Sequence, residues 1–99
     1  MKVAGVLEQA KLAAEDHFKY ARFVQNAEML NDDTDAIPDG EQLSAYQACW
    51  FELEIVNALA LDEWESDGRP ADWATTWTER YKKDAEDLIT NLCAILRQQ

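Results

Sequence analysis

Apolar residues return every three or four positions in three stretches of the chain, the spacing that places them on one side of an α-helix. These stretches predict helices over about residues 2–30, 40–66 and 71–97. No useful length of sequence alternates with the period of a β-strand. The pattern therefore predicts an all-α protein, an antiparallel three-helix bundle with long helices that forms one domain over residues 1–99.

The expected helix boundaries carry recognisable start and stop signals. The segment NDDTDAIPDG, residues 31–40, reads as a loop. Asp39 is a suitable N-cap for the second helix, with Gln42 at the capping-box position. Gly68 suits the position just past a helix end, and Pro70 cannot continue that helix.

The second expected helix is apolar on more than one side. Its main stripe consists of Leu43, Tyr46, Cys49, Trp50, Leu53, Val56, Leu59, Ala60 and Trp64. Phe51, Ile55 and Leu61 lie outside that stripe. A helix of this kind is central in its fold or pairs with another chain. We therefore expect Leu53 and Val56 in the core, and a dimer that shares this helix is the alternative architecture.

The charge of the chain is concentrated in its middle third. The net charge is −11, and residues 31–67 hold eleven acidic residues and no Lys or Arg. The flanking segments are balanced, with four residues of each sign before residue 31 and five of each after residue 67. Nucleic acid and anionic membranes repel such a protein, so we expect it to bind neither. A basic protein surface is the expected partner.

The residues offer little support for catalysis or metal binding. His17, the single histidine, falls on an apolar stripe, where a core histidine with one bonded partner is the plain interpretation. Cys49 and Cys93 lie in apolar surroundings typical of reduced core thiols. The carboxylate pairs Asp62–Glu65 and Asp84–Asp87 fall out of register in an antiparallel hairpin, which weakens a magnesium site. We expect no enzymatic activity, no cofactor and no metal.

The end of the second helix combines carboxylates with tryptophans. Four acids, Asp62, Glu63, Glu65 and Asp67, crowd a helix C-terminus, where each opposes the helix dipole by up to about 0.3–1 kcal/mol. Trp64 and Trp73 flank the turn and could close the core or stand exposed as interface anchors. Solubility is the alternative role for the acids. The predicted partner-binding residues are Asp32, Asp33, Asp35, Asp62, Glu63, Trp64, Glu65, Asp67 and Trp73.

Two acidic clusters at opposite ends of one long helix would occupy a positively charged channel in place of a phosphate backbone. In this charge layout the chain resembles small, acidic, phage-encoded proteins that disarm host defence, including anti-CRISPR proteins and DNA mimics. The resemblance implies an inhibitor of a basic, nucleic-acid-handling protein, acting in the cytoplasm, that of the host cell if phage-encoded. The alternative is a helical assembly or adaptor protein that self-associates through the second helix, as a possible homodimer.

Overall fold

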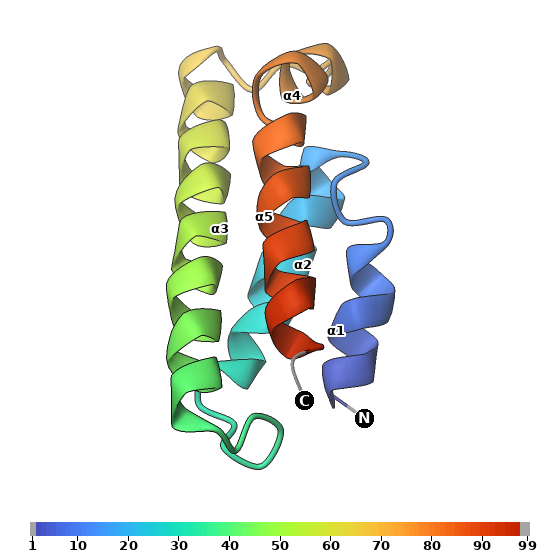
Figure 1. Ribbon diagram of the computed structural model, residues 1–99. Helices are drawn as coiled ribbons and strands as arrows, with labels where there is room; N and C mark the ends of the chain where they lie inside the picture. The colour runs from blue at the N-terminus through green and yellow to red at the C-terminus, as the bar shows by residue number, and fades with distance from the viewer. Residues whose placement is uncertain (1, 98–99) are drawn as a thin grey trace.

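The chain folds into helices joined by short irregular segments (Figure 1). The computed structural model describes residues 2–97 and contains no strand within them. The elements are α1 (Lys2–Ala10), α2 (His17–Ala27), the short 3-10 helix η1 (Glu28–Leu30), α3 (Gly40–Ser66), α4 (Ala74–Arg80) and α5 (Lys82–Leu96). The all-α prediction is confirmed. The expected three-helix bundle is replaced by a five-helix arrangement, because the first and third expected helices are each divided in two.

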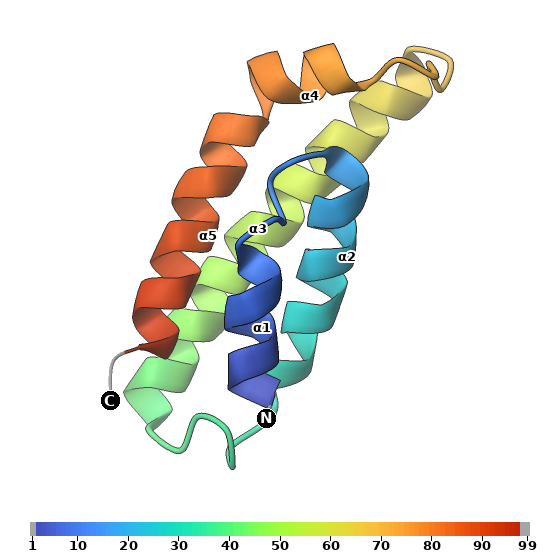
Figure 2. The same ribbon diagram turned by 90° about the vertical axis from the view of Figure 1, so that its right-hand side faces the viewer.

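Four of the helices run up and down the long axis, and the fifth crosses one end. Helices α1 and α2 lie side by side in opposite directions, α3 spans the full length, and α5 returns beside it (Figures 1 and 2). Helix α3 packs against both α2 and α5, and α1 packs against α2 and α5. The result is a rod of 43 × 20 × 19 Å with α4 lying across its upper end.

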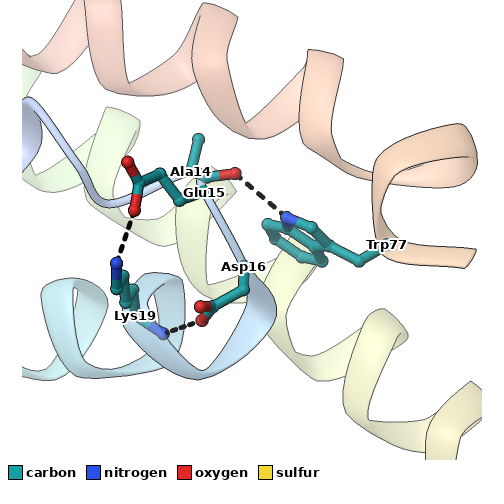
Figure 3. Close-up of polar contacts among 5 residues, drawn as sticks. All are labelled: Ala14, Glu15, Asp16, Lys19 and Trp77. Carbon is teal, nitrogen blue, oxygen red and sulfur yellow. Dashed lines mark hydrogen bonds and ion pairs between the residues drawn. The ribbon is translucent and has the colours of Figure 1, made fainter. Parts of the chain in front are cut away.

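The first expected helix is interrupted at residues 11–16 because Asp16 starts a new helix. Its carboxylate accepts a hydrogen bond of 2.8 Å from the backbone N–H of Lys19, the geometry of an N-cap (Figure 3). The interruption also frees the backbone carbonyl of Ala14, which accepts a 3.0 Å bond from the indole N–H of Trp77. The Trp77 bond therefore satisfies one carbonyl at the break, and residues 11–13 and 15 donate their backbone N–H groups to the carbonyls three residues back.

The third expected helix begins three residues later than predicted and bends at Tyr81. Residues 70–73 are irregular, and α4 starts at Ala74. At Tyr81 the backbone leaves helical geometry, with φ −124° and ψ −31°, so that α4 and α5 point in different directions. The threonines of α4 are weak helix formers, so interrupting the helix in this region costs little free energy.

The second expected helix is confirmed with its predicted bounds. The Asp39 carboxylate accepts bonds from the backbone N–H groups of Glu41 and Gln42, which caps α3. Gly68 adopts φ 85° and Arg69 φ 56°, the left-handed conformation that ends the helix. The side chain of Gln42 completes no capping box. Its amide donates instead to the carbonyl of Ile95 on α5 at 2.8 Å.

The buried core draws side chains from every helix, α1 and η1 included, and from the loop before α3. Leu53 is fully buried as predicted, and Val56 is partly buried against the same cluster. The largest fully buried side chains are Trp77, Tyr20, Tyr46, Phe23, Leu30, Ile37, Leu53, Leu92 and Val24. Tyr20 and Tyr46 bury their hydroxyl groups by donating to the carbonyls of Leu53 (2.8 Å) and Ala27 (2.6 Å). These two bonds connect α2 to α3.

Candidate functional site

The three aspartates predicted in the loop before α3 have different roles. Asp33 turns its carboxylate back on the loop and accepts bonds from the backbone N–H groups of Asp35 (3.2 Å) and Ala36 (3.0 Å). This is an Asx-type turn, so Asp33 holds the loop conformation. Asp32 and Asp35 are exposed. Of the three, they are the carboxylates that a partner can reach without disturbing the loop.

The acidic corner at the end of α3 is partly neutralised. Glu63 is half-buried, accepts the hydroxyl of Tyr81 at 2.6 Å and pairs with Arg80 at 3.2 Å. Glu65 lies 3.8 Å from Arg69. Arg80, which is distant from Glu63 in sequence, reaches it because the chain bends at Tyr81. Asp62 and Asp67 remain exposed.

The tryptophans at this corner have their polar edges satisfied inside the protein. Trp64 donates to the carbonyl of Pro70 at 3.1 Å, with the guanidinium of Arg69 over its ring. Trp73 donates to Nδ1 of His17 at 3.0 Å. Both rings are half-buried. The two tryptophans therefore help to close the end of the core, whether or not their exposed edges also contact a partner.

His17 is the centre of an aromatic cluster and has no nitrogen available for chemistry. Its Nε2 lies 3.0 Å from Oδ1 of Asn57, and its Nδ1 accepts the N–H of Trp73. These partners require a neutral ring with the proton on Nε2. The ring stacks on Trp77 at 5.1 Å. Burial lowers the pKa of His17, and this effect outweighs the hydrogen bond to Asn57 and the charge of Asp16, which raise it.

A second surface lies on the outer side of α3, and we name it the α3 ridge. It consists of Phe51, Ile55 and Leu59, which are 59%, 43% and 58% exposed. Their spacing of four residues aligns them along one side of the helix. The sequence placed Leu59 on the main apolar stripe with Leu53, but the structure exposes Leu59. Phe51 and Ile55 were placed outside that stripe. The four-residue repeat of large apolar residues is the signal that could have identified the ridge.

Hollows with acidic rims flank the ridge on both sides. A hollow of about 530 Å³ opens between η1 and α3, where Phe51, Trp50 and Met29 form the apolar part and Glu28 and Asp32 the acidic part. A hollow of about 370 Å³ opens between α3 and α5, where Ile55, Val56 and Leu88 form the apolar part. The acidic residues of this second hollow are Glu52, Asp84 and Asp87.

The rims of both hollows carry negative charge, and within residues 2–97 an ion pair neutralises it at one position. Among the described residues, Asp87 has an ion pair, with Lys83 at 3.6 Å, and the other four rim carboxylates have none. Burial, reinforced by the nearby charge of Glu28, raises the pKa of Glu54 on the η1 side of the ridge. The outer side of α3 is therefore apolar along its crest and negative along its edges.

Other kinds of site find no support in the described part of the chain. Within residues 2–97 no group of three or more His, Cys, Asp or Glu side chains is arranged to hold a metal ion. No described helix is both long enough and apolar enough to cross a membrane. Cys49 and Cys93 are buried free thiols, and burial raises the pKa of Cys49 to about 11. Comparison with protein-family models, curated proteins and solved structures finds no match.

Proposed function

We propose that the protein is a non-enzymatic inhibitor that binds a basic, nucleic-acid-handling protein through the acidic residues of segment 31–67, which comprises α3 and the loop residues on either side of it. The observation that carries this proposal is the one-sided charge of residues 31–67, eleven acids without a base. Its exposed members include Asp32 and Asp35 before α3 and Asp62 and Asp67 at its other end. A helix of 27 residues separates the two clusters by about 40 Å, a span suited to an extended basic channel.

The test uses a corner variant, Asp62→Lys with Asp67→Lys, which reverses two exposed carboxylates without touching the Glu63–Arg80 pair. The assay is displacement of a labelled DNA duplex from a basic effector complex, with CRISPR effector complexes tried first. The wild-type protein should release the duplex. The corner variant should associate about tenfold more slowly, and raising the salt concentration should weaken the wild type in the same way.

A matched control separates a local surface from overall charge. Glu8→Lys with Glu86→Lys makes the same change in net charge on α1 and α5, outside the acidic segment. This control should keep most of the inhibition. If the corner variant binds the identified partner as the wild type does and binding ignores salt, the carboxylates serve solubility alone and the proposal fails.

Self-association through α3 is the second candidate function, and the exposure of the α3 ridge favours it. Two copies that bury this ridge against each other would form a dimer held by Phe51, Ile55 and Leu59. Sedimentation of the wild-type protein at several concentrations tests this candidate directly. A stable dimer that dissociates on Phe51→Ser would support it.

A further inference from the structure

The α3 ridge is an exposed apolar surface that the fold leaves uncovered. Its three side chains stand between two hollows that continue the apolar surface toward η1 and toward α5. Leu53, two residues from Phe51 and on the inner side of α3, is 0% exposed. Exposed apolar surface with a polar rim is typical of a protein–protein interaction site.

The charge around the ridge selects among possible occupants. A second copy related by a two-fold axis would set the same acidic rims opposite each other. An anionic membrane or a nucleic acid would meet the same repulsion. A segment with an apolar stripe and flanking Lys or Arg residues would instead satisfy Glu28 and Asp32 on one side and Glu52 and Asp84 on the other.

We propose that the α3 ridge docks a basic amphipathic helix of the partner protein, whose apolar stripe covers Phe51, Ile55 and Leu59 while its flanking cations meet the acidic rims. This inference rests on the proposed function and names the part of the partner that is recognised. The ridge is about 12 Å long from Phe51 to Leu59. Two to three turns of a helix cover that length, in the helix-in-groove mode of recognition.

The probe is a fluorescein-labelled synthetic helix of about 18 residues with leucines on one stripe and arginines along both flanks. A matched peptide carries glutamates in place of the arginines. Fluorescence anisotropy should show binding of the arginine peptide and none of the glutamate peptide. The Phe51→Ser, Ile55→Ser double variant should lose about tenfold or more in affinity. The rim variant Glu28→Lys, Glu52→Lys should lose a similar factor.

The control is Leu12→Ser, which removes an exposed apolar side chain of comparable exposure, 56%, from the turn between α1 and α2. It should bind the peptide as the wild type does. A wild-type dimer that the double serine variant dissociates would assign the ridge to a second copy and overturn the proposal. Equal binding of both peptides, or equal losses in Leu12→Ser and the double variant, would overturn it as well.

The two proposals fail in different ways. If the double serine variant still displaces duplex from the effector complex, acidic residues alone carry inhibition and the ridge proposal is wrong. If the arginine peptide binds the ridge but no basic nucleic-acid-handling protein is inhibited, the ridge proposal stands and the proposed function fails. Circular dichroism of each variant verifies that its helices remain intact, so that a loss of binding reports on the surface.

Discussion

The upper end of the rod and the outer side of α3 both carry large apolar side chains, but they are buried at the first and exposed at the second. At the upper end, Trp77 is fully buried, and His17 and Trp73 are hydrogen-bonded to each other. On α3, Phe51 and Leu59 are more than half exposed. Aromatic and acidic residues in one stretch of sequence therefore do not identify a binding surface. The two regions differ in whether other parts of the same chain cover and hydrogen-bond these side chains.

The largest expected effect is at Trp77. Trp77→Ala removes the fully buried indole, its stacking on His17 and its bond to Ala14, so we expect a loss of about 3–5 kcal/mol in the free energy of unfolding. Chemical denaturation followed by circular dichroism measures it. A loss below about 1 kcal/mol would mean that α4 does not close the core, and the comparison between the two regions would break down.

Leu53→Ala tests the inner side of α3. Leu53 is fully buried in the core, and its truncation should cost about 2–5 kcal/mol by lost burial and a cavity. The same denaturation experiment applies. A change below about half a kcal/mol would place the residue in solvent and reverse the assignment of inner and outer sides.

The pH dependence of stability tests the cluster around His17. The folded protein lowers the pKa of His17 below 6.5, so the unfolded chain binds the proton more readily. This contribution to stability is therefore fully present above the unfolded-state pKa of the histidine and is lost as pH falls below it. A proton on Nδ1 would displace the N–H of Trp73. The melting temperature should decrease between about pH 7.5 and 5.5. His17→Gln should flatten this decrease, and an unchanged slope in that variant would assign the dependence to other groups.

The corner variant tests whether exposed acids oppose the dipole of α3. Asp62→Lys with Asp67→Lys should leave the fold intact and raise stability by up to about 0.3–1 kcal/mol per residue at low salt. A thermal melt at low and high salt measures both the gain and its screening. Loss of binding together with a gain of stability is the expected signature of a surface kept for recognition. Clear destabilisation would indicate a structural role for these carboxylates.

The smallest expected effect is at the ridge. Phe51→Ser should change the free energy of unfolding by no more than about 0.5 kcal/mol, because the side chain is 59% exposed. Set beside Leu53→Ala, this variant compares the two sides of one helix within two residues. A loss above about 2 kcal/mol in dilute protein would mean that Phe51 is covered, either by the chain itself or by a second copy.

The breaks in the first and third expected helices could not be predicted from periodicity. The apolar spacing continues through residues 11–16, and nothing local to Ala14 shows that Trp77 will bond its free carbonyl. Asp16 was a readable N-cap signal, but a capping residue inside a helical pattern competes with continuation of the helix. At the candidate site, Asp32 and Asp62 could be identified as exposed acids, whereas the pairing of Glu63 with Arg80 depends on the bend at Tyr81.

The sequence by itself determined the helical class, the bounds of α3 and the confinement of net negative charge to residues 31–67, because these follow from local spacing, capping residues and composition. The tertiary structure alone decided which sides of α3 are covered. Helical periodicity places Phe51, Ile55 and Leu59 on one line, but it does not say whether a neighbouring helix lies over them. Helices α2 and α5 pack against the other sides of α3, so burial was assigned by long-range contacts that no local pattern records.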